Sequence, residues 1–106
     1  MVKISFNPKK YEIKITGHAK CGKKGEDIVC AAVSALFYTL AQSVISVPHM
    51  FKEPPKVSDE SGNGYLSCKP KEEYERNVAL IYWTICNGFS LLSEEYKENV
   101  KFIAKN

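Results

Sequence analysis

A histidine and a cysteine lie twelve residues apart in this sequence, on either side of a short segment rich in glycine and lysine. His18 precedes the segment and Cys30 follows it. A thiolate is the nucleophilic form of cysteine, and an imidazole within reach can take the thiol proton and later protonate a leaving amine. The pair therefore predicts a Cys–His dyad for acyl transfer.

The residues around Cys30 suit this chemistry. A helix that begins near Asp27 places Cys30 in its first turn, where unpaired backbone N–H groups and the helix dipole favour a thiolate. Asp27 is expected to cap this helix. Ser34, one turn beyond Cys30 on the same face, is placed to hold a water, the histidine or the substrate. Gly22 and Gly25 permit unusual backbone angles and can leave N–H groups for an oxyanion hole.

Each of these residues also has a structural explanation. A buried cysteine more often packs than reacts, glycines form turns, and a serine can bond back to its own helix. His18, Cys21 and Cys30 could alternatively bind zinc. No fourth ligand is obvious, and His49 is the one spare histidine. Cys68 and Cys86 are expected to pack.

The composition describes one globular domain over residues 1–106. Apolar residues make up 44% and charged residues 25%, which excludes disordered and collagen-like chains. The four cysteines form no C-x-x-C pair and the opening "MVKISFNPKK" does not resemble a signal peptide, so reduced thiols and a cytoplasmic location are expected. No cofactor is expected.

The net charge of +3 is a mild basic excess, and Arg76 is the only arginine. Arginine is the preferred residue for bidentate reading of bases and phosphates. We therefore expect no direct recognition of nucleic acid, while loose attraction to an acidic surface or a ribosome stays open.

Hydrophobic periodicity predicts the elements that position the dyad. Alternation predicts strands at 2–6 and 11–16, joined by a turn over 7–10. Residues 27–47 read as a helix that is apolar on all sides, so a buried central helix is expected. Its twenty uncharged residues, 28–47, are long enough to cross a bilayer, but Tyr38 and Gln42 and the soluble pattern elsewhere favour no membrane.

The second half repeats the strand–strand–helix order. Three prolines make 46–56 a connection, and "SGNG" at 61–64 predicts a hairpin between "KVSDE" and "YLSCK". Pro70 is expected in the first turn of an amphipathic helix, and 100–104 forms a last strand. The order ββαββαβ is that of an α+β domain with two helices on a mainly antiparallel sheet.

The stretch "GHAKCGKKGEDIVCAAVSAL" resembles, as a whole, the signature of the ribosomal-processing cysteine protease family, Prp. That signature is G-H-A, two variable residues, then G-x-x-G-x-D-I-V-C-A-A-V-S. The matching residues are Gly17, His18, Ala19, Gly22, Gly25, Asp27, Ile28, Val29, Cys30, Ala31, Ala32, Val33 and Ser34. The order of elements and the length also agree with the family.

The resemblance implies a small homodimeric cysteine endopeptidase. Such enzymes remove a hydrophobic N-terminal extension from the precursor of a large-subunit ribosomal protein of the bL27 type during ribosome assembly. Cys30 would be the nucleophile, His18 its base, and Gly17, Gly22, Gly25, Asp27 and Ser34 supporting or substrate-binding residues. Residues 19–25 would form a mobile flap that admits the peptide.

Two points stay open at this stage. Cys21 occupies a variable position of the signature, and a second thiol near the dyad could form a reversible disulfide with Cys30 or be inert. A non-catalytic, ribosome-associated binding module with a structural His/Cys pair is the alternative function, and it predicts an unreactive Cys30. Phe37, Tyr38, Phe51, Tyr82 and Trp83 would add to the apolar surface that favours a homodimer.

Overall fold

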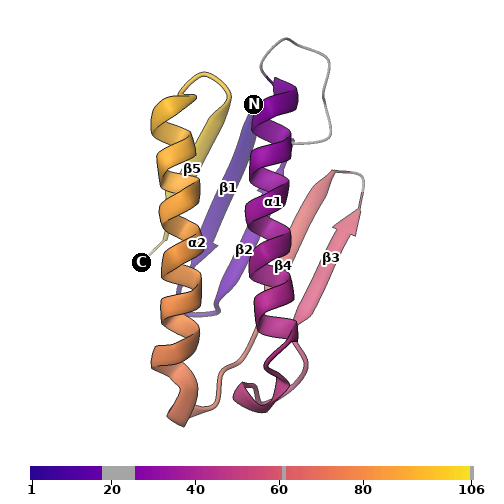
Figure 1. Ribbon diagram of the computed structural model, residues 1–106, viewed down its shortest axis with the longest axis vertical. Coiled ribbons are helices and arrows are strands. Elements are labelled where there is room, and N and C mark those ends of the chain that lie inside the picture. The colour runs from indigo at the N-terminus through magenta and orange to yellow at the C-terminus, as the bar shows by residue number, and fades with distance from the viewer. Residues whose placement is uncertain (18–25, 61, 106) are drawn as a thin grey trace.

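The structure is a computed structural model that describes residues 1–17, 26–60 and 62–105, with only the backbone of Glu26 and Asp27. Two helices lie side by side on one face of a five-stranded sheet (Figure 1). The elements are β1 Val2–Asn7, β2 Glu12–Thr16, α1 Glu26–Ile45, β3 Lys56–Glu60, β4 Asn63–Ser67, α2 Glu75–Glu95 and β5 Val100–Ala104. Two short 3-10 helices, η1 Pro48–Met50 and η2 Glu72–Tyr74, complete the order. The α+β class and the ββαββαβ order are thus confirmed.

The strand order in the sheet is β3-β4-β2-β1-β5. Three neighbouring pairs are antiparallel, and β5 runs parallel to β1. Alternate residues therefore point to opposite faces. Ile4, Ile15 and Leu66 point toward the helices and are at most 1% exposed, whereas their lysine and serine neighbours point away.

The first helix is not the central helix that the sequence suggested. Val33, Leu40 and Val44 of α1 are fully buried against the sheet, but Ile28 and Tyr38 are exposed on its outer side. Over Ile28–Ile45, which is long and apolar enough to cross a bilayer, 39% of the residues are buried. The physical reason is the two-layer architecture, because a helix on one face of a single sheet keeps an open side.

The boundaries differ from expectation in three places. α1 begins at Glu26 and ends at Ile45, close to the predicted range 27–47. Strand β4 takes in Asn63 and Gly64 of the predicted turn, so the β3–β4 connection is only residues 61–62. Pro70 precedes α2 by a full 3-10 turn and pairs with Phe51 in an isolated bridge, so it does not start the helix.

Candidate active site

The described residues of the predicted site lie at one end of the two-layer fold. β2 ends at Thr16, Gly17 follows it, and α1 begins at Glu26 after the intervening segment. The first residues of β1 lie at the same end, since Lys3 pairs with Thr16. The fold therefore places Gly17, the residue before His18, at the same edge as the start of the helix that carries Cys30.

Gly17 is the residue at this edge whose backbone only glycine tolerates. Its φ is +84°, in the left-handed region. A Cβ atom at Gly17 would lie 2.5 Å from the carbonyl oxygen of Met1. The chain thus turns sharply out of β2 directly before His18, in close contact with the N-terminal residue.

Cys30 is the fifth residue of α1, just beyond the first turn. Helical side chains tilt toward the N-terminus, so its sulfur lies over that first turn, where the positive end of the dipole acts. Cys30 is 7% exposed and belongs to the main apolar cluster with Val29 and Val33. The predicted position of Cys30 near the helix start is correct.

Ser34 lies one turn after Cys30 on the same flank of α1 and is half-buried. Phe37 continues this flank, and its ring packs against Gly64, where an added Cβ would lie 3.3 Å away. Tyr38 donates a hydrogen bond to the carboxylate of Asp59 in β3. The flank of α1 that carries Cys30 and Ser34 is therefore the one that faces the β3–β4 hairpin.

Several predicted residues lie outside the described part of the chain: His18, Cys21, Gly22 and Gly25. Asp27 is the second residue of α1, so it lies inside the helix and not at its cap, contrary to expectation.

The two other described cysteines pack, as expected. Cys68 follows β4 and Cys86 lies in the middle of α2, and both are buried. The Cys68 sulfur lies 3.3 Å from the Tyr82 hydroxyl. Burial raises the pKa of Cys68, and it raises the pKa of Cys86 from 9.0 to about 11. Both thiols are therefore held neutral at ordinary pH.

Across residues 1–17, 26–60 and 62–105, no three histidine, cysteine or acidic residues lie close enough to hold a metal ion. The zinc alternative depends on His18 and Cys21, which lie outside these ranges. His49, its proposed spare ligand, is exposed in η1, and its ring packs edge-on against Tyr74 at 5.4 Å.

Comparison with known proteins decides the family. The family model described as "Cysteine protease Prp" matches residues 1–101. This chain belongs to the Prp family of cysteine proteases. The resemblance predicted from residues 17–34 is thereby confirmed over almost the whole chain.

Relatives with known names support the same family. The ribosomal processing cysteine protease Prp of Staphylococcus aureus (strain Mu50) is 25% identical over 100 residues, which cover 94% of this chain and 92% of that protein. The crystal structure of S. aureus Prp in complex with a substrate peptide has a TM-score of 0.73 at 26% identity, covering 98% of this chain and 97% of that one. A second S. aureus structure, with a covalently linked product peptide, has a TM-score of 0.69 at 25% identity, covering 99% and 100%.

Two contacts that shape this site were not anticipated from the sequence. Gly17 was recognised as part of the signature, but its contact with Met1 depends on the pairing of β1 with β2. The bond from Tyr38 to Asp59 joins α1 to the hairpin across twenty-one residues. Neither leaves a local signal, because both depend on tertiary placement.

Proposed function

We propose that this protein is a cytoplasmic endopeptidase that removes the N-terminal extension of a large-subunit ribosomal protein of the bL27 type during ribosome assembly. The observation that carries the proposal is the position of Cys30 at the start of α1 in a chain that belongs to the Prp family. The S. aureus relative, named as a ribosomal processing protease and crystallised with a substrate peptide, supports this substrate class.

Cys30 is the nucleophile of the proposed mechanism and His18 its base. His18 accepts the thiol proton, and the thiolate attacks the carbonyl carbon of the scissile peptide bond. The tetrahedral intermediate collapses, His18 protonates the leaving amine, and a thioester to Cys30 remains. A water molecule, deprotonated by His18, hydrolyses the thioester and restores the thiol. The covalently linked product peptide in the S. aureus relative supports a covalent intermediate of this kind.

The supporting residues have separate roles in this proposal. Gly17, with a φ of +84°, gives the backbone turn that ends β2 directly before His18. Gly22 and Gly25 supply backbone N–H groups for the oxyanion, and residues 19–25 act as the flap that admits the peptide. Ser34 holds the histidine, a water or the substrate from the flank that it shares with Cys30.

The direct test is incubation of the purified protein with the precursor ribosomal protein, followed by mass measurement of the fragments. The proposal predicts one cut near the N-terminus and none with Cys30→Ala. A matched Cys86→Ala variant should cleave normally, because Cys86 is a packing residue. Uncleaved precursor with the folded wild-type protein would contradict the proposal and would favour the non-catalytic binding module.

A homodimer is also part of the proposal, and α2 offers a surface for it. Of the aromatic residues expected to be exposed, Phe37, Phe51 and Tyr82 are buried within one chain, so that part of the reasoning was wrong. The outer side of α2 nevertheless exposes Leu80, Trp83 and Leu91 at helical spacing, each about two-thirds exposed. Apolar residues repeated along an exposed helix favour a two-fold helix pair.

Mass measurement in dilute solution tests this arrangement. The wild type should be a dimer at micromolar concentration, and Trp83→Glu should give monomers because a charge would lie in the apolar contact. The matched control is Ile103→Glu. Ile103 lies in β5 and is 46% exposed, so this change should leave the dimer intact. A monomeric wild type would contradict the homodimer.

A further inference from the structure

Charges are segregated between the two layers of the molecule. The helices α1, η2 and α2 contain seven acidic residues and one basic residue: Glu26, Asp27, Glu72, Glu73, Glu75, Glu94, Glu95 and Arg76. The face of the sheet that no described element covers has the opposite character. Strand residues that point away from the helices include four exposed lysines, namely Lys3, Lys14, Lys56 and Lys101. Only Glu12 and Glu60 are acidic among these outward positions.

Two of these lysines are direct neighbours across the sheet. Lys3 of β1 and Lys101 of β5 are Cα partners in the parallel ladder, and both side chains are exposed. Adjacent strands lie about 4.8 Å apart, and like charges directly opposite each other destabilise a sheet. A bound anion would offset this repulsion.

The lysine face continues into a hollow of about 510 Å³ at the end of the sheet that carries the β1–β2 turn. Five lysines line it: Lys9, Lys10, Lys52, Lys56 and Lys69. Four glutamates line it as well: Glu12, Glu53, Glu72 and Glu75. This end of the sandwich is opposite to the start of α1, so the hollow is remote from Cys30.

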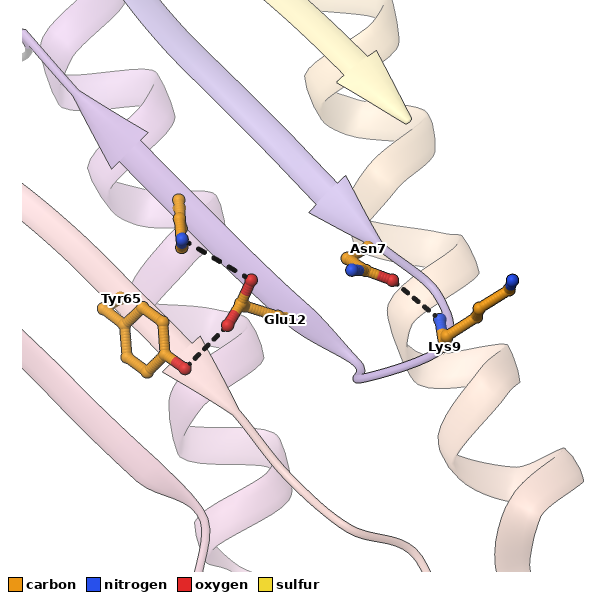
Figure 2. Close-up of polar contacts among 5 residues, drawn as sticks. Asn7, Lys9, Glu12 and Tyr65 are labelled. Atoms are coloured by element: carbon orange, nitrogen blue, oxygen red, sulfur yellow. Dashed lines mark hydrogen bonds and ion pairs between the residues drawn. The ribbon is translucent and has the colours of Figure 1, made fainter. Parts of the chain in front are cut away.

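Internal contacts already occupy two of the acidic groups that line the hollow. The Tyr65 hydroxyl donates a hydrogen bond to the Glu12 carboxylate at 2.8 Å (Figure 2). The Lys14 Nζ lies 3.8 Å from the other oxygen of the same carboxylate. Glu53 pairs with Lys69 at 3.2 Å. These contacts reduce the negative charge that is available to the other lysines of the hollow.

The remaining lysines of the hollow have no such partner. Within the part of the chain that the structure describes, Lys9, Lys10, Lys52 and Lys56 form no ion pair. The side chain of Lys9 points away from Glu12, while its backbone N–H is bonded to the Asn7 side chain at 3.1 Å (Figure 2). The hollow therefore presents uncommitted ammonium groups on a fixed backbone.

We propose that the lysine face of the sheet and this hollow bind the phosphate backbone of RNA without sequence specificity. Lysine without arginine suits point contacts to phosphates and not base reading. Protein–protein interfaces are depleted in lysine and rely on aromatic and arginine anchors, whereas nucleic-acid interfaces are polar and strongly positive. This face carries lysines, serines and threonine with few large apolar side chains, so RNA fits it better than an acidic protein does.

This surface would hold the enzyme against RNA through the layer opposite its helices. It is a second site, separate from the proposed protease chemistry, and its test measures binding alone. Variants of the lysines in the hollow should keep full activity on a short peptide substrate, so failure of one proposal leaves the other standing.

The experiment measures binding of a labelled single-stranded RNA by fluorescence anisotropy between 50 and 200 mM salt, a range in which phosphate contacts dominate the response. Lys9→Gln with Lys56→Gln should lower the slope of log K against log salt by about 1.4, since each contact to a single strand contributes about 0.7. The same relation predicts about fivefold weaker binding for each lysine at 0.1 M salt. Circular dichroism confirms that the double variant is folded.

The matched control is Arg76→Gln with Lys97→Gln, which removes the same charge from exposed residues of α2 and of the turn that follows it. It should leave the slope unchanged. Equal weakening by the control pair would overturn the proposal, because binding would then follow net charge alone. Binding of poly-glutamate as tight as that of RNA would also overturn the proposal, because the surface would then favour an acidic protein. The absence of RNA binding at 50 mM salt would overturn it as well.

Discussion

Cys30 and Cys86 each lie in a long helix and are almost equally buried, at 7% and 9% exposed. Their positions along the helices differ: Cys30 is the fifth residue of α1, and Cys86 is the twelfth of α2. Burial raises the pKa of Cys86 to about 11, and no helix end lies near enough to oppose that effect. The comparison teaches that burial is nearly the same for the proposed nucleophile and for a packing cysteine, whereas their distance from a helix start differs.

The largest expected effect is the loss of Cys30. Cys30→Ala should lower the cleavage rate by on the order of a thousandfold or more, because no other group can form the thioester. Cys30→Ser should be nearly as damaging, since a hydroxyl is a far poorer nucleophile beside a dyad. A cleavage time course on the precursor measures both, alongside a folding check. Full activity in folded Cys30→Ala would show that Cys30, like Cys86, is not needed for cleavage.

His18→Ala should give the next largest effect. Loss of a general base lowers a rate by on the order of a hundredfold or more. The matched control is His49→Ala, because His49 is exposed in η1 and its ring packs edge-on against Tyr74. The same time course should show a normal rate for the control. Equal rates in the two variants would mean that His18 is not the base.

Gly17→Ala should lower the stability of the folded protein, which would test the importance of the turn that precedes His18. The change forces an L side chain into φ +84° and against the Met1 carbonyl oxygen. We expect a loss of about 2 kcal/mol in the free energy of unfolding, measured by urea titration. Gly88→Ala is the control, since the atoms that it approaches are the flexible end of Leu36. A smaller loss for Gly17→Ala than for Gly88→Ala would contradict this account of the turn.

The last expected effect is confined to alkaline solution and is a pH dependence from Cys86. Its pKa is higher in the folded than in the unfolded protein, so the folded state keeps the proton longer. The stability that this gives is complete below pH 9 and falls as the pH rises from 9.0 toward about 11. Urea midpoints across this range should fall less steeply for Cys86→Ala than for the wild type. Identical slopes would show that the Cys86 thiol is not held neutral by burial.

Much of the fold could be predicted because its signals are local. Alternating residues marked β1, β2 and β5, and spacings of three and four marked α2. The strand order could not be predicted, because the parallel pairing of β5 with β1 depends on which edge the α2 crossover reaches. The sequence also did not predict the exposed side of α1. Apolar residues on every side of a helix do not show how many layers of the fold will cover it.

The site was predicted in part for the same reason. The helix start before Cys30 is encoded locally, so its placement could be anticipated, and Gly17 was identified within the signature. The lysines of the outer sheet face could also have been found, because Lys3, Lys14 and Lys101 all occupy the polar positions of alternating strands. Their gathering on one surface was not visible, since it depends on the register of three separate strands.

The most direct test of the central claim is the rate at which each thiol of the native protein is alkylated by iodoacetamide near pH 7. Thiolate character and access govern this rate, so the labelled peptides report on the difference between the cysteines. The account predicts that Cys30 reacts fastest, on the order of tenfold or more ahead of Cys68 and Cys86, which burial keeps protonated. Labelling of Cys86 or Cys68 at the rate of Cys30, or faster, would contradict it.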